Sequence, residues 1–74
     1  MKKIINGEQP FQIAAHSFSV YSEDAYTLNF SADGENYTAW DEETPAGETL
    51  IVNGIAKNMY FYLEGNTTDA TITF

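Results

Sequence analysis

Cysteine is absent from this chain, and histidine occurs only once, at position 16. Without cysteine the chain forms no disulfide and offers no thiolate ligand to a metal ion. A single histidine leaves neither a Cys–His nucleophile pair nor a tetrahedral zinc site within one chain. The sequence therefore predicts no structural metal site and no cofactor.

Positive charge is also scarce, because three basic residues stand against eleven acidic ones and give a net charge of −8. The phosphates of nucleic acids and of anionic lipids repel such a chain. We expect binding neither to nucleic acid nor to membranes, and a basic protein surface is the partner that this charge favours.

Long hydrophobic runs are missing as well. Met1-Lys2-Lys3 resembles the charged start of a signal peptide, but the polar residues from Asn6 to Gln9 interrupt the apolar run that should follow. The sequence therefore predicts no signal peptide and synthesis in the cytoplasm of the producing cell.

A chain of 74 residues is long enough for one domain, spanning residues 1–74. A domain of this size buries only about 60% of the surface that its unfolded chain exposes. Its stability is then small, and without disulfides or metals the usual remaining support is the surface of a partner.

The stretch from Tyr26 to Trp40 predicts two strands joined by one tight turn. Tyr26, Leu28 and Phe30 alternate with polar residues, which is typical of a half-buried strand. Asp33-Gly34 supplies the positive φ that a hairpin turn needs, and the segment Asn36–Trp40 returns as the partner strand. We expect the rest of the chain to cover this hairpin.

Further short strands are predicted on both sides of the hairpin, separated by turn signals such as Asn6-Gly7, Asn53-Gly54 and Gly65-Asn66. No segment has helical periodicity. The predicted fold is an all-β, compact antiparallel β-sandwich, jelly-roll-like or a partly open barrel, of about seven or eight short strands. The expected strands are 2–5, 11–15, 17–21, 26–31, 36–40, 49–52, 58–63 and 70–74.

The segment Asn58–Leu63 predicts a strand with aromatic residues on both faces. Met59, Phe61 and Leu63 are assigned to the core, which leaves Tyr60, Tyr62 and Glu64 on the outer face. The two tyrosines either form an interface, where tyrosine is enriched, or lie under the crossover 55–58 or another strand. We take the following residues as candidates for partner binding: Tyr60, Tyr62, Glu64, Asp41, Glu42 and Glu43.

Carboxylates gather in the loop Asp41–Glu48, which we expect to cap one end of the sheet. Oxygen ligands in clusters are what Ca²⁺ selects, but the spacing fits no EF-hand, and a solvated loop is the favoured interpretation. Paired carboxylates also serve glycoside hydrolysis, although only in a cleft that so short a chain hardly encloses. Trp40, at a strand end, is assigned to the core rather than to a sugar-binding platform.

His16 is the other candidate for chemistry, because Ser17 and Asp24 lie near it in the sequence and complete a Ser-His-Asp set. No nucleophile turn or oxyanion hole is visible beside it. We therefore interpret His16 as a histidine at a strand edge and predict that the protein is not an enzyme.

The central hairpin resembles discoidin-type and related galactose-binding-like β-sandwiches. The likeness rests on Tyr26-x-Leu-x-Phe-Ser-x-Asp-Gly-x-Asn-Tyr-Thr-x-Trp40, on Asn53-Gly54 and on the strand from Asn58 to Gly65. Tyr37 stands where that pattern has tryptophan, and the loops that form the discoidin ligand site are mostly missing. The resemblance implies a β-sandwich, and a small carbohydrate-binding adhesion module is the alternative function.

As a whole, the chain is similar to small auxiliary, or decoration, capsid proteins of crAss-like gut tailed bacteriophages. The likeness is carried by three segments: Ser31–Tyr37, Asp41–Leu50 and Val52–Phe61. It implies a non-enzymatic virion structural protein that binds and stabilises the major capsid protein lattice, with copies of itself as a further partner. The expected location is then the virion, and a glycan is a partner only under the alternative function.

Overall fold

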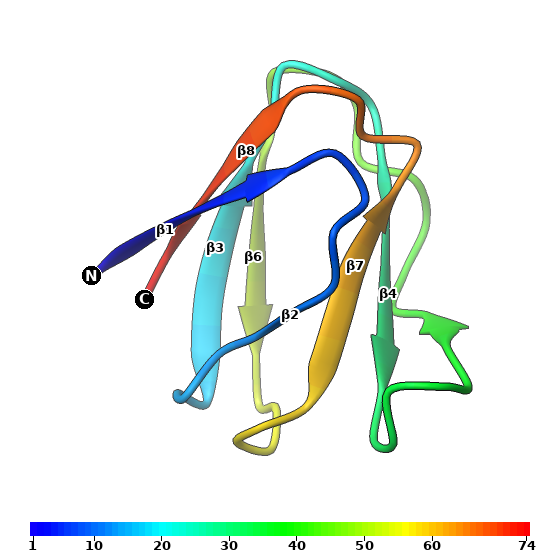
Figure 1. The fold of residues 1–74 in the computed structure, drawn as a ribbon. Helices are drawn as coiled ribbons and strands as arrows, with labels where there is room; N and C mark the ends of the chain where they lie inside the picture. The colour runs from blue at the N-terminus through cyan, green and yellow to red at the C-terminus, as the bar shows by residue number, and fades with distance from the viewer.

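Two antiparallel sheets of four strands each pack face to face in a computed structural model that describes residues Met1–Phe74 (Figure 1). The first sheet has the order β1-β8-β3-β6, and the second has the order β2-β7-β4-β5. The predicted all-β sandwich is confirmed. A partly open barrel is not formed, because no strand pairs across the two sheets. The strands are β1 (Lys2–Asn6), β2 (Phe11–Gln12), β3 (Ser17–Tyr21), β4 (Thr27–Ser31), β5 (Thr38–Ala39), β6 (Thr49–Asn53), β7 (Tyr60–Glu64) and β8 (Asp69–Thr73).

The strand order is that of a jelly roll. β1 pairs with β8, β2 with β7, β3 with β6 and β4 with β5, so the second half of the chain runs back along the first. Two additional pairings, β3 with β8 and β4 with β7, close this long hairpin into two sheets. The jelly-roll-like form of the prediction therefore describes the chain correctly.

The central hairpin exists, but its connection is longer than predicted. β4 pairs with β5 through Phe30 opposite Thr38 and Asn29 opposite Ala39, and β5 contains only these two residues. Residues 32–37 form a loop rather than one tight turn. The predicted return strand Asn36–Trp40 is thus too long.

Side-chain hydrogen bonds explain why this loop takes the place of a tight turn. The Asp33 carboxylate accepts hydrogen bonds from the backbone N–H groups of Glu35 and Asn36, at 2.8 and 2.9 Å. The Ser31 hydroxyl oxygen accepts the N–H groups of Asp33 and Gly34. Gly34 has the predicted positive φ, +81°. Local bonds of this kind compete with strand pairing and end the ladder early.

The turn signals Asn53-Gly54 and Gly65-Asn66 do not join neighbouring strands of one sheet. Each carries the chain from one sheet to the other, β6 to β7 and β7 to β8. Gly54 and Gly65 still adopt positive φ, at +72° and +95°. These signals therefore predict where a strand ends but not which strand it pairs with.

The core lies between the sheets and is centred on three phenylalanine rings. Phe61 stacks on Phe11 with a centroid distance of 5.7 Å and meets the edge of Phe18 at 5.0 Å. Phe61 and Leu63, which the sequence assigns to the core, are buried, whereas Met59 is only partly buried. The predicted strand 11–15 shortens to β2, although Ile13 remains in the core.

β4 is buried on more of its surface than its sequence predicts. Leu28 faces the core as expected, but Asn29 and Ser31 on the opposite face are also buried. Their partners in β7 are Tyr62 and Tyr60, whose large side chains share that face. The alternation of apolar and polar residues describes one strand alone. It therefore does not reveal that side chains of the neighbouring strand bury the polar face.

We expect Phe61→Ala to lower the free energy of unfolding by about 3–5 kcal/mol, because it removes a fully buried ring that contacts two others. Urea denaturation followed by circular dichroism measures this change. Ile4→Ala is the control, since Ile4 is 57% exposed and a much smaller change is expected. Equal unfolding midpoints for the Phe61→Ala variant and the parent would contradict this account of the core.

Candidate functional site

The outward face of β7 carries the predicted aromatic pair. Tyr60 and Tyr62 are half-buried and Glu64 is exposed, so the strand faces are as predicted. The Tyr62 ring meets Tyr37 edge to face with a centroid distance of 4.8 Å. A Cβ at Gly34 would lie 3.4 Å from the Tyr60 ring. The loop 32–37 thus covers part of both rings and leaves the rest exposed.

Tyr37 is a member of this surface that the sequence argument missed. It lies in the loop 32–37, and only the length of that loop folds its ring back onto Tyr62. The available signal was an aromatic residue placed shortly after an Asp-Gly turn. Together, Tyr37, Tyr60, Tyr62 and Glu64 form what we call the β7 face.

Negative charge adjoins the rings of the β7 face. Burial raises the pKa of the Tyr62 hydroxyl, and the carboxylates of Glu64 and Glu8 raise it further. Asn29 Nδ2 donates a hydrogen bond to Glu64 Oε1 at 3.1 Å, which orients that carboxylate along the sheet. The Tyr62 hydroxyl therefore stays protonated at neutral pH and is available as a hydrogen-bond donor beside two acceptors.

The acidic loop lies on the other side of β4 from the β7 face. Its anchor is Thr44, which pairs with Tyr26 through two backbone hydrogen bonds of 2.7 and 3.1 Å. Asp41, Glu42 and Glu43 are exposed. The six predicted partner-binding residues therefore form two patches. The second patch and Glu64 lie at the same end of the second sheet, whereas Tyr60 begins β7 at the opposite end, roughly 13 Å from Glu64 along the strand.

Tyr26 itself is fully buried, and its hydroxyl has no hydrogen-bond partner. Burial raises the pKa of this hydroxyl to about 12. The residue holds the acidic loop through its backbone and supports the core with its ring. It does not reach the surface.

The remaining candidates for chemistry do not assemble. No three acidic or histidine side chains come together in a group that would hold a metal ion, so the acidic loop does not form the Ca²⁺ cluster considered above. His16 Nδ1 donates to the Ile55 carbonyl oxygen at 2.7 Å, whereas Asp24 lies beyond the opposite end of β3. Trp40 packs edge to face on Phe30 at 5.4 Å, which supports its assignment to the core.

One end of the sandwich is held together by buried and charge-assisted hydrogen bonds. The amide of Asn66, 2% exposed, bonds to Ser22 and to the carbonyl groups of Gly7 and Thr68. The N–H of Thr67 is the main reason that the pKa of Asp24 lies below its usual range. These loops are thus tied to one another, a function of Asn66 and Asp24 that the turn signal alone did not reveal.

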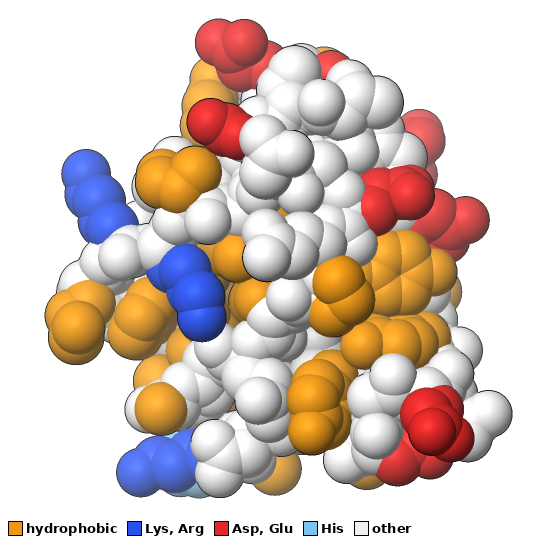
Figure 2. Space-filling model, viewed as in Figure 1, with side chains coloured by type: hydrophobic (Ala, Val, Ile, Leu, Met, Phe, Trp, Pro, Cys, Tyr) orange, Lys and Arg blue, Asp and Glu red, His pale blue; other side chains and the backbone are white.

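Charge is distributed unevenly along the strand direction. One end of the sandwich, which we call the acidic end, is formed by loops 7–10, 22–26, 40–48 and 65–68. The opposite end, which we call the basic end, is formed by loops 13–16, 32–37 and 54–59 and by both termini. Every acidic residue except Asp33 and Glu35 lies in a loop or at a strand terminus of the acidic end. The three lysines lie toward the basic end. Figure 2 shows lysine side chains on the left and carboxylate side chains at the top and along the right of the visible face.

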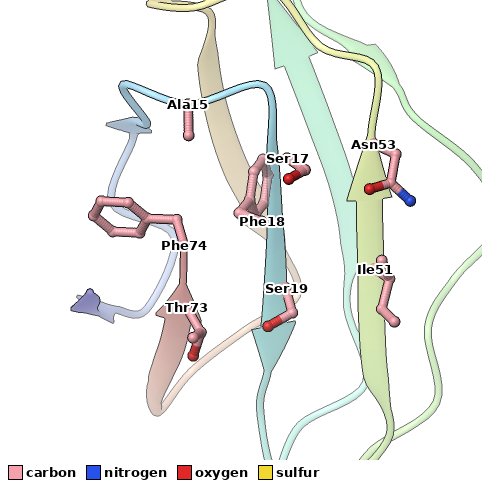
Figure 3. Close-up of a pocket in the computed structure, with 8 residues that line it drawn as sticks. All are labelled: Ala15, Ser17, Phe18, Ser19, Ile51, Asn53, Thr73 and Phe74. Atoms are coloured by element: carbon pink, nitrogen blue, oxygen red, sulfur yellow. The ribbon is translucent and has the colours of Figure 1, made fainter.

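A hollow of about 290 Å³ lies at the outward side of β3 in the first sheet (Figure 3). Ser17, Ser19, Ile51 and Asn53 border it from β3 and β6, and no ionisable side chain lines it. Such a lining offers shape and weak hydrogen bonding but no acid, base or nucleophile with a shifted pKa.

No family model, curated protein or solved structure matches this chain. The structure contains no helix that is long and apolar enough to cross a bilayer. Functional inference therefore depends on the surfaces described above.

The turn at Asp33 predicts a loss of stability in acid. Its pKa lies well below the usual value of 3.8, first because the Asn36 N–H and then the Glu35 N–H donate to the carboxylate. The stabilising contribution is therefore present above that value and is lost as pH falls. Between about pH 5 and pH 2, the Tm advantage of the parent over Asp33→Asn should shrink, because the amide does not titrate.

Thermal unfolding monitored by circular dichroism at several pH values measures this difference. Glu43→Gln is the control, because Glu43 is exposed and lies outside the turn. If the Tm difference for Asp33→Asn stays constant across this pH range, the turn does not depend on an ionised Asp33.

Proposed function

We propose that this protein is a non-enzymatic binding module that attaches to a repeating protein surface, as an auxiliary, or decoration, capsid protein of a virion. The observation that carries the proposal is the β7 face, where half-buried tyrosines adjoin a carboxylate on a strand of the rigid sandwich. Aromatic residues of this kind supply much of the affinity of protein interfaces.

The tyrosines of the β7 face are already partly ordered by their neighbours. Tyr62 rests on Tyr37, and Tyr60 lies against Gly34. Side chains that are fixed before binding lose little conformational entropy when a partner covers them. The partial ordering of the two rings therefore supports the interpretation of the β7 face as a binding surface.

The charge distribution supports a basic partner. Glu64, at the end of β7, belongs to the acidic end, and so do Asp41, Glu42 and Glu43. Opposite charge around an apolar contact selects and orients the partner more than it adds affinity. A lattice surface with lysine or arginine around an apolar site fits this arrangement.

The fold supports the proposed function by analogy. Jelly rolls occur in viral capsid proteins and in lectins, so the strand order agrees with either of the two functions considered. The resemblance to decoration proteins of crAss-like phages favours the first. The only hollow is lined by residues without ionisable side chains, which also favours a binding protein over an enzyme.

A carbohydrate-binding module is the second candidate, because three tyrosine rings gather on one sheet face and aromatic faces stack on sugars. A glycan array with the isolated protein separates the two functions. Binding of a defined glycan at millimolar affinity or better would favour the carbohydrate module over the lattice protein.

Replacing Tyr60 and Tyr62 together by serine should reduce occupancy on purified capsids while the protein stays folded, since both rings point away from the core. Occupancy is measured by sedimenting capsids mixed with the variant. Tyr21→Ser is the matched control, because Tyr21 is 45% exposed on the other sheet and should leave occupancy unchanged. Full occupancy of the folded double variant would exclude the β7 face as the binding surface, and loss of folding would mean that the two rings support the core.

Replacing Glu42 and Glu43 by glutamine should make attachment to capsids less sensitive to salt, because exposed charges at a rim act through screened attraction. Occupancy is compared between about 50 and 500 mM NaCl, a range over which the Debye length falls severalfold. Glu35→Gln, at the basic end, is the control. An unchanged salt dependence would mean that the acidic loop does not face the partner.

A further inference from the structure

The free edges of the two sheets differ in how they are protected. A free edge exposes backbone groups that pair with any extended chain, and proteins blunt such edges with short strands or charges. β2 and β5, the edges of the second sheet, contain two residues each. β1, one edge of the first sheet, carries Lys2 and Lys3, and the Lys3 ammonium lies 3.5 Å from the Gln12 carbonyl oxygen.

β6, the other edge of the first sheet, has none of these devices. It is five residues long, Thr49–Asn53, and contains neither a charge nor a proline. It pairs only with β3, and no residue of β6 takes part in a backbone hydrogen bond outside the sheet ladders. Ile51, at its centre, is 67% exposed. This edge is therefore open to a further strand.

We propose that a second copy of this chain docks on β6, so that the two β6 strands pair antiparallel about a twofold axis through Ile51. The arrangement joins the first sheets of the two copies into one continuous sheet. It places Ile51 opposite Ile51 of the second copy, and Leu50 opposite Val52 of the second copy. The interface is isologous, as in most dimers of identical chains.

The side chains of β6 fit this register. Residues directly opposite each other in an antiparallel pair share a face. Val52 is fully buried on the inward face, whereas Leu50 on the same face is only half-buried and leaves apolar surface exposed at the edge strand. The second copy covers Leu50. On the outward face the two Ile51 side chains meet next to the hollow (Figure 3).

Charge selects a second copy in the antiparallel orientation. Glu48 precedes β6 at the acidic end, and Lys57 follows β6 at the basic end. Antiparallel pairing sets the acidic end of each copy beside the basic end of the other, whereas parallel pairing would place the two acidic ends together. β6 itself has no carboxylate that would recognise a basic peptide.

The first test is sedimentation equilibrium of the purified protein, which needs no capsid and is independent of the proposed function. We expect a monomer–dimer equilibrium, and Ile51→Lys should raise the dimer dissociation constant by about tenfold or more because two lysines would lie opposite each other. Ile4→Lys is the matched control, since Ile4 is 57% exposed on the same sheet. A monomer up to millimolar concentration, or equal effects of both variants, overturns the proposal.

The orientation has its own test. Lys57→Glu and Lys2→Glu change the net charge equally, but only Lys57 lies in the loop that follows β6. In the antiparallel dimer Lys57→Glu should raise the dissociation constant more than Lys2→Glu does. Equal effects of the two variants would overturn the antiparallel arrangement.

Hydrogen exchange of the unmodified protein tests the interface without any substitution. Raising the protein concentration through the dimerisation range should slow amide exchange in β6 and leave β1, the opposite edge of the first sheet, unchanged. Slower exchange in β1 alone, or no change in β6, would overturn the proposed dimer.

Discussion

The structure depends on the chain folding back on itself at residues 32–37. From this loop outward, each strand of the first half pairs with its counterpart in the second half, until β1 meets β8 and the two termini lie side by side. The loop is held by Ser31 and Asp33 rather than by strand pairing. Most remaining contacts are long-range, so no part of the sandwich forms its hydrophobic face without the others.

The uneven charge follows from the same topology. Because strands alternate in direction, the loops after β1, β3, β5 and β7 all lie at one end. The sequence places most of its acidic residues in those four loops and its lysines elsewhere. Their mutual repulsion is offset locally, since Asp24 accepts hydrogen bonds from Thr67 and Thr68, and Glu8 accepts the Gly65 N–H. These hydrogen bonds allow the loops of the acidic end to stay folded although they carry many like charges.

Period-two alternation predicted the class of fold and the buried side of β7, because burial of Phe61 and Leu63 is a property of one strand. Strand partners were less predictable. Asn53-Gly54 has the composition of a hairpin turn, yet it joins two sheets. The reason is that β6 and β7 each pair with a strand of the first half of the chain and not with each other. In the candidate site, Tyr60, Tyr62 and Glu64 were placed on the correct face. Tyr37 and the separation of the acidic loop from these residues were missed, because both depend on contacts between strands.

The two sheets use their outward surfaces differently. In the second sheet, the loop 32–37 folds over part of the β7 face, and the edge strands are too short to recruit another strand. In the first sheet, the Ile51 side chain is 67% exposed, and the free edge of β6 makes no further backbone hydrogen bond. A jelly roll of this length has too few residues to blunt every edge and to cover both outer faces. A contact through β6 and a contact through the β7 face lie on different sheets, so one copy has room for both at the same time.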